Sequence, residues 1–134
     1  MADADDERCF LIIEDDPLSL KLYSDLVRSR GYQVITATDG QTGLELAREH
    51  HPDLVLSDLD LPGRSGTEIC AALKLDHRTR DIPILIVTGW PDMETAVRCA
   101  GCDGFLRKPV SVSAFWLTIE ALIRKRARNG NPTS

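Results

Sequence analysis

The sequence predicts a doubly wound α/β fold built on a five-stranded parallel sheet, and two patterns predict it. Five short apolar runs alternate along the 134-residue chain with five segments of helical periodicity. The runs are apolar throughout rather than at alternate residues, which is typical of strands covered on both faces of a parallel sheet. A chain of this length forms about one domain and buries a core without disulfide or metal staples.

The expected strands are the apolar runs, each bounded by polar residues, glycine or proline. They span 9–13, 32–37, 53–58, 82–88 and 104–108. The expected helices lie between and after them, at 17–31, 39–51, 65–76, 92–101 and 111–128. Residues 1–8 and 128–134 are expected to be disordered tails, so the domain should span 9–127.

The first expected helix has clear end signals. Pro17 suits its first turn, Asp16 suits its N-terminus, and Gly31 stops it. Helical spacing predicts that Leu18, Leu22, Leu26 and Val27 face the core, which leaves Leu20 off that face. In the last helix Phe115 and Trp116 are adjacent, so we do not expect both to face the core equally.

Composition narrows the function classes. The chain is 43% hydrophobic and 28% charged, which is ordinary for a globular protein, and a net charge of −5 argues against bulk nucleic-acid binding. The basic cluster at 124–128 is interpreted as a solvated helix end, so no direct DNA binding is expected. No apolar run reaches membrane-spanning length and the N-terminus has no signal peptide, so a cytoplasmic location without membrane contact is expected.

The four cysteines include one pair with redox or zinc spacing, Cys99 and Cys102. A zinc site would need two further ligands, and the sequence has no second C-x-x-C or H-x-x-x-H pattern. We therefore interpret the cysteines as small, mostly buried residues.

Polar residues gather where the expected strands end. Glu14, Asp15 and Asp16 follow the first strand, Asp58 ends the third, Thr88 ends the fourth, and Lys108 ends the fifth. The carboxyl ends of parallel strands share one edge of the sheet, where ligands bind. Converging carboxylates without histidine or cysteine suit Mg²⁺, and a carboxylate beside a hydroxyl and an ammonium suits phosphoryl transfer to that carboxylate.

These residues resemble the receiver domain of two-component response regulators, over roughly 9–127. The ordered set that carries the resemblance is Glu14-Asp15, Asp58, Thr88 and Lys108-Pro109, with "DLDLPGRSG" and "AGCDGFLRKP" as supporting stretches. The resemblance implies a flavodoxin-like (βα)5 sandwich with strand order 2-1-3-4-5. The ordered set of site residues is a specific signal for this family, whereas each dipeptide alone is a weak one.

The resemblance also implies residue roles. Asp58 would be the phosphoacceptor, Thr88 the switch hydroxyl, Phe105 the switch aromatic, and Lys108 the contact to the phosphoryl group. Mg²⁺ would be held by Asp15 and Asp58, by Glu14 through water, and by the backbone carbonyl of Asp60. The Lys108–Pro109 peptide bond would be cis.

The function implied is that of a stand-alone response regulator in a two-component system or phosphorelay. It would take a phosphoryl group from a histidine kinase or a histidine phosphotransfer protein. Phosphorylation would switch partner binding through the face formed by the fourth helix, the fifth strand and the fifth helix. It would be no enzyme beyond its own phosphorylation and dephosphorylation, and a monomer or weak dimer.

Two alternatives stay open. The stretch Asp58-Leu59-Asp60 resembles the D-x-D motif of haloacid dehalogenase-type phosphohydrolases, although that motif normally follows the first strand and precedes its acidic pair. The second alternative is a receiver that binds partners without being phosphorylated, which would be expected if a site residue were missing; none is.

Overall fold

The computed structural model describes residues 8–89 and 101–130, with side chains through 126. In chain order its elements are β1 (Cys9–Ile13), α1 (Pro17–Arg28), β2 (Gln33–Ala37), α2 (Gly40–His50), β3 (Leu54–Asp58), α3 (Gly66–Leu75), β4 (Ile84–Thr88), β5 (Gly104–Arg107) and α5 (Val112–Gly130). The helix expected at 92–101 falls almost entirely outside the described residues, as do Trp90 and Cys99.

The five strands form one parallel sheet in the order β2-β1-β3-β4-β5, which confirms the predicted fold class and strand order. In the central pair, Ile13 of β1 lies opposite Ser57 of β3. On the other side of β3, Asp58 lies opposite Val87 of β4. The register therefore brings the carboxyl ends of β1, β3 and β4 to the same level at one edge.

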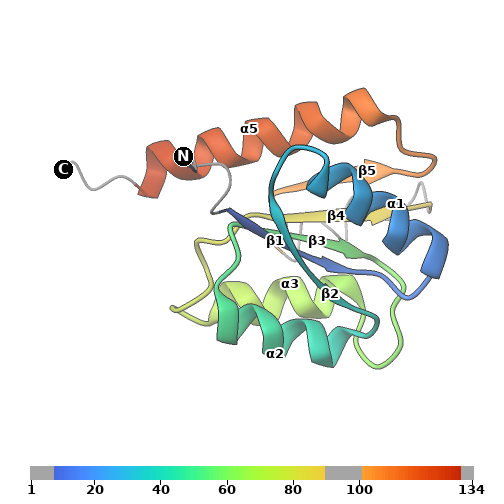
Figure 1. Cartoon of the computed structure of the whole chain (residues 1–134). Helices are drawn as coiled ribbons and strands as arrows, with labels where there is room; N and C mark the ends of the chain where they lie inside the picture. Colours follow the sequence, from blue (N-terminus) through green and yellow to red (C-terminus); the bar gives the residue numbers. More distant parts are fainter. Residues whose placement is uncertain (1–7, 90–100, 131–134) are drawn as a thin grey trace.

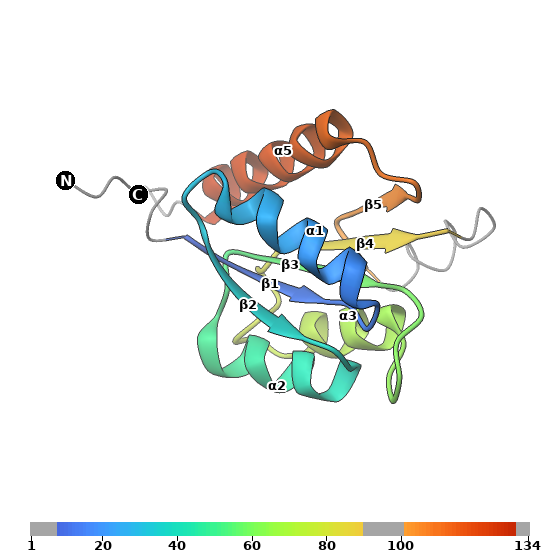
Figure 2. The ribbon, with the colours of Figure 1, turned by 45° about the vertical axis from the view of Figure 1, so that its right-hand side comes forward.

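The helices cover both faces of this sheet. Helices α1 and α5 lie on one face and α2 and α3 on the other (Figures 1 and 2). Successive strand residues point to opposite faces, so Phe10 and Ile12 pack beneath α1 and α5, while Leu11 and Ile13 pack beneath α2 and α3. The two edge strands, β2 and β5, are less buried, because most of their residues are exposed or half-buried.

The predicted core face of α1 is confirmed for Leu26 and Val27 but was wrong for Leu18 and Leu22. Leu18 and Leu22 are 79% and 50% exposed, whereas Tyr23, Ser24 and Val27 are buried. Leu20, expected off the core face, is half-buried and packs against the core beneath α1 and α5. The helix carries two apolar stripes, and the one that includes Tyr23 and Val27 packs against the sheet.

Phe115 and Trp116 of α5 are both buried, but they pack against different neighbours. Phe115 stacks on Tyr23 of α1, with ring centroids 5.9 Å apart. Trp116 instead packs near Tyr32, and the Arg30 guanidinium lies 3.9 Å from its ring centroid. The segment that joins α1 to β2 thus covers a second side of α5, which a helical wheel for α5 alone does not include.

Helices α1 and α3 each begin directly after a residue whose side chain caps the helix N-terminus. The Asp16 side chain accepts hydrogen bonds from the backbone N–H and the hydroxyl of Ser19, as expected for the N-cap of α1. Ser65 and Glu68 form a reciprocal capping box at α3. Helix α5 continues to Gly130, so 128–130 belong to the helix rather than to the expected tail.

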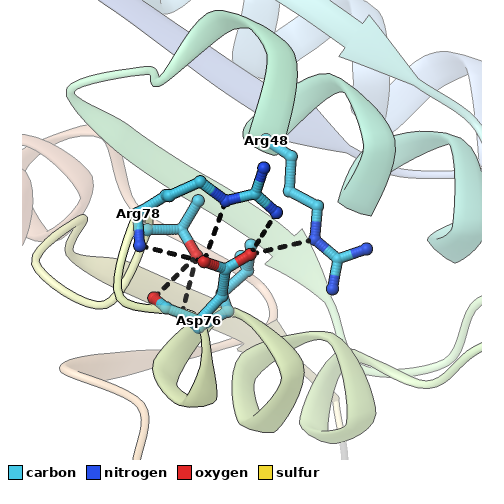
Figure 3. Close-up of polar contacts among 5 residues, drawn as sticks. Arg48, Asp76 and Arg78 are labelled. Atoms are coloured by element: carbon cyan, nitrogen blue, oxygen red, sulfur yellow. Dashed lines mark hydrogen bonds and ion pairs between the residues drawn. The ribbon is translucent and has the colours of Figure 1, made fainter.

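The ends of α2 and α3 are joined by an ionic cluster (Figure 3). Asp76, at the end of α3, accepts hydrogen bonds from the backbone and side chain of Arg78. Arg48 of α2 approaches the same carboxylate at 3.5 Å. The Arg78 hydrogen bonds hold the pKa of Asp76 well below its usual value, and the Arg48 charge adds to this effect.

None of the described helices is long and apolar enough to cross a membrane.

Candidate functional site

Three carboxylates meet at the carboxyl edge of the sheet. Glu14 and Asp15 follow β1, and Asp58 ends the neighbouring strand β3. One oxygen from each lies within 4.8 Å of the others. Glu14 is buried, Asp58 is half-buried, and Asp15 is exposed, so the cluster opens from the protein interior toward solvent.

The Lys108 ammonium reaches this cluster from the end of β5. Its Nζ lies 3.4 Å from Asp58 Oδ1 and 3.5 Å from Glu14 Oε1. The backbone N–H of Lys108 donates to the Thr88 carbonyl at 2.8 Å, which ties the turn after β5 to the end of β4. The following bond to Pro109 is cis. One ammonium thus lies beside two of the three carboxylates, and the site keeps a net negative charge.

Asp58 is fixed by its own loop. The backbone N–H of Leu59 donates to Asp58 Oδ1 at 2.9 Å, and the Ser57 hydroxyl donates to the Asp58 carbonyl at 2.9 Å. Gly66, the first residue of α3, donates its N–H to the Leu59 carbonyl at 2.8 Å. A Cβ at Gly66 would lie 2.5 Å from the Asp58 carbonyl oxygen, so only glycine allows α3 to approach this closely.

The charges of the cluster shift two pKa values. Burial raises the pKa of the Glu14 carboxyl above its usual value, and the Asp58 charge opposes its ionisation further. Burial lowers the pKa of the Lys108 ammonium, but the Asp58 and Glu14 charges outweigh that effect, so its pKa lies above the usual value. Lys108 is therefore a fixed positive charge at neutral pH.

The cluster fits a divalent cation. Glu14 Oε1 is buried and accepts no hydrogen bond from the described part of the chain, although the Lys108 ammonium lies 3.5 Å away. Oxygen ligands that carry more negative charge than the protein itself compensates are the donor set that Mg²⁺ prefers. The three carboxylates that the resemblance implies around Mg²⁺ thus lie close enough together to share one ion.

The other predicted site residues lie around this cluster. Thr88 is buried at the end of β4, and Asp60 is exposed in the loop that follows β3. Phe105 of β5 is half-buried and packs against the core beneath α2 and α3. A cavity of about 320 Å³ lies at the opposite edge of the sheet, where it includes Lys74 and Asp103 and plays no part in this site.

Sequence reasoning missed two residues that support the site, Ser57 and Gly66. The sequence predicts Gly66 at the start of a helix, but nothing in the residue pattern there indicates that it contacts the Asp58 backbone. A serine directly before the strand-end aspartate is the signal that was available for Ser57, since a hydroxyl in a buried strand needs a partner.

Comparison with known proteins decides the family. A family model described as the response regulator receiver domain matches residues 10–120. The chain belongs to this family. It is 42% identical over 115 residues to the polar-differentiation response regulator DivK of Brucella ovis, which covers 84% of this chain and 94% of the relative. The DivK protein of Brucella anthropi is 41% identical over the same length.

Solved receiver structures share the fold. A response regulator from Chloroflexus aurantiacus superposes with a TM-score of 0.84 at 26% identity, over 88% of this chain and 98% of that chain. The receiver domain of a Pseudomonas aeruginosa sensor histidine kinase gives a TM-score of 0.82 at 23% identity, with the same coverage. That domain has a magnesium ion coordinated in its active site cleft.

Proposed function

We propose that this receiver domain accepts a phosphoryl group on Asp58 and thereby switches its affinity for partner proteins. The observation that carries the proposal is the position of the Lys108 ammonium, 3.4 Å from a carboxylate that ends a strand beside two further acids. A lone strand-end aspartate would serve equally well as a turn former. An aspartate held by its loop and facing a fixed cation is arranged for nucleophilic attack on a phosphorylated donor.

The transfer step needs only residues of this chain and the phosphorylated donor. An Asp58 carboxylate oxygen attacks phosphorus, the bond from phosphorus to the donor atom breaks, and the bonding pair leaves with the donor. The product is an acyl phosphate on Asp58. Lys108 neutralises charge on the phosphoryl oxygens, and the Thr88 hydroxyl donates a hydrogen bond to one of them.

Mg²⁺ completes the proposed site. Asp15 and Asp58 would hold it, with Glu14 acting through water and the Asp60 carbonyl as a further ligand. When bound, the ion neutralises the phosphoryl oxygens and the surrounding carboxylates. The acidic cluster and the magnesium-bound receiver of Pseudomonas aeruginosa support this assignment.

The donor and the output follow from the family. We assign the donor as the phosphohistidine of a histidine kinase or a histidine phosphotransfer protein in the cytoplasm. The phosphoryl group would favour the state in which Thr88 and Phe105 turn toward it, which biases an existing equilibrium. Partner binding would then involve β5 and α5 together with the expected helix at 92–101.

The experiment is intact-mass measurement after incubation with Mg²⁺ and acetyl phosphate, for wild type, Asp58→Asn and Asp60→Asn. We expect a Mg²⁺-dependent phosphoryl adduct on wild type and on Asp60→Asn, and none on Asp58→Asn. An unmodified, folded wild type would contradict the proposal and favour a receiver that binds without phosphorylation. Steady release of phosphate from many equivalents of p-nitrophenyl phosphate would instead favour a phosphohydrolase.

A further inference from the structure

Helix α3 is clamped to the segment that leads into β5, at the sheet edge opposite Asp58. Lys74 Nζ lies 2.8 Å from Asp103 Oδ2 and donates to the carbonyls of Arg80 and Ile82. The Asp103 carboxylate accepts the Ile84 N–H at 2.8 Å, and the Asp103 N–H donates to the Ile84 carbonyl at 2.9 Å. These bonds fix the position of residue 103 relative to α3 and β4.

Two cysteines lie directly beside this clamp. Cys70 is one helical turn before Lys74, and Cys102 is the residue before Asp103. Both belong to the core beneath α2 and α3, where Cys70 is fully buried and Cys102 is half-buried. Gly101, with φ +86°, makes the turn that brings Cys102 against α3, and a Cβ there would lie 3.6 Å from Lys74 Cγ.

The two thiols are neighbours in the core beneath α2 and α3. The Cys102 thiol raises the pKa of the Cys70 thiol, and burial raises it further, so Cys70 is protonated at neutral pH. Cys102 is the more exposed residue of the two. This asymmetry sets the order in which the sulfurs would react with a small oxidant that arrives from solvent.

We propose that Cys70 and Cys102 form a reversible intramolecular disulfide when the protein meets a peroxide. The bond would fasten α3 covalently to the segment that enters β5. This modification site is independent of the phosphoryl-transfer proposal, because it lies at the other edge of the sheet and involves none of the same side chains.

The chemistry balances with hydrogen peroxide as the oxidant. Cys102 gives up its thiol proton, its sulfur attacks one peroxide oxygen and the O–O bond breaks. The departing hydroxide takes up that proton, so the products are a sulfenic acid on Cys102 and one water. The Cys70 sulfur then attacks the Cys102 sulfur, the S–O bond breaks, and the Cys70 proton leaves with the departing hydroxide as a second water. Two thiols are oxidised and one peroxide is reduced.

The cross-link also has a geometric demand. A disulfide brings the sulfurs to about 2.05 Å and the Cβ atoms to about 3.8 Å, so the two neighbouring thiols must close on each other. The clamp between Lys74 and Asp103 holds the two backbones in place during this approach. A cross-link restricts the unfolded chain, so the oxidised protein should unfold thermally at a higher midpoint than the reduced protein.

The test is intact mass and peptide mapping after treatment with a slight excess of hydrogen peroxide, without reductant. We expect wild type to lose about 2 Da, the mass of two hydrogens, with the peptides that carry Cys70 and Cys102 joined. Dithiothreitol should restore the original mass. The Cys9→Ser variant is the matched control, since Cys9 lies in β1 away from the pair, and it should behave as wild type.

Two variants make the result specific. Cys70→Ser should lose the cross-link and leave a sulfenic acid on Cys102 that dimedone traps, while Cys102→Ser should leave residue 70 unmodified. Their thermal unfolding in reductant shows whether each variant folds. Three results would each overturn the proposal: full alkylation of both cysteines in folded wild type after peroxide, a link from Cys99 to Cys102, or links only between molecules.

Discussion

At the scale of single residues, the electrostatics of the site depend on Lys108. Its ammonium faces Asp58 and Glu14 at 3.4 and 3.5 Å, so it compensates a buried carboxylate before any phosphoryl group is present. The same ammonium is in place to neutralise the phosphoryl oxygens as they arrive. A static ion pair and a catalytic contact are therefore made by one group, and removing it should affect both.

We expect Lys108→Met to slow phosphorylation of Asp58 by acetyl phosphate about a hundredfold, the usual cost of losing one charge-stabilising donor. Lys125→Met, on the exposed side of α5, is the control and should react at the wild-type rate. The measurement is the rate at which the phosphoryl adduct accumulates by mass spectrometry, with circular dichroism as the check on folding. Equal rates for the two variants would remove Lys108 from the mechanism.

At the scale of elements, the start of α3 determines where Asp58 sits. A methyl group on Gly66 would lie 2.5 Å from the Asp58 carbonyl oxygen and 3.0 Å from Leu59 Cα. We expect Gly66→Ala to lower the free energy of unfolding by about 1–3 kcal/mol, the usual cost of overpacking. Gly89→Ala is the control, because a Cβ there meets only Lys108 Cβ at 4.0 Å. Urea unfolding of both variants checks this, and equal midpoints would contradict it.

The ionic cluster that joins α2 to α3 should make stability depend on pH. Because the pKa of Asp76 is lowered in the folded protein, its contribution is complete above its ordinary value of 3.8 and is lost as the pH falls through the folded pKa. Asp76→Asn should therefore unfold at less urea than wild type at neutral pH, and the difference should shrink below pH 3.8. Asp81→Asn, an exposed neighbour, should match wild type at neutral pH. A difference that persists unchanged in acid would contradict this account.

The positions of the helices and strands were largely predictable from the sequence, but which side of a helix faces the sheet was not. Each strand is an apolar run and each described helix has a capping signal, so existence and order follow from local pattern. Leu18 and Leu22 follow a helical stripe as regular as the buried one, yet they are exposed. Which stripe faces the sheet depends on how the helix packs against the rest of the domain, and that is a tertiary constraint.

At the scale of the whole molecule, α5 is fastened to the rest of the domain by aromatic packing. Trp116 is 6% exposed, its ring lies 6.0 Å from that of Tyr32 in the segment before β2, and Arg30 lies over its face. We expect Trp116→Ala to lower the free energy of unfolding by about 3–5 kcal/mol, as large-to-small core changes do. Leu117→Ala, one residue on and 66% exposed, should stay within about 0.5 kcal/mol. Similar losses in denaturant titrations of the two variants would show that Trp116 does not anchor α5.

Topology explains why the site residues could be named from the sequence. Strands β1 and β3 are neighbours in the sheet, so the residues at their carboxyl ends lie at the same edge, whichever side chains they carry. The distances from the Lys108 ammonium to two carboxylates could not be predicted in this way. They depend on the turn after β5, which is tied to Thr88, and on the path of a long side chain across the end of β4.

The central claim is that Asp58 itself carries the phosphoryl group, and borohydride trapping tests it most directly. Protein treated with Mg²⁺ and acetyl phosphate is reduced with borohydride, which converts an aspartyl phosphate to homoserine, and the digested peptides are sequenced by mass spectrometry. We predict homoserine at position 58, only in samples that received both Mg²⁺ and the donor. Homoserine at position 60, or aspartate unchanged throughout a folded and treated sample, would contradict the assignment.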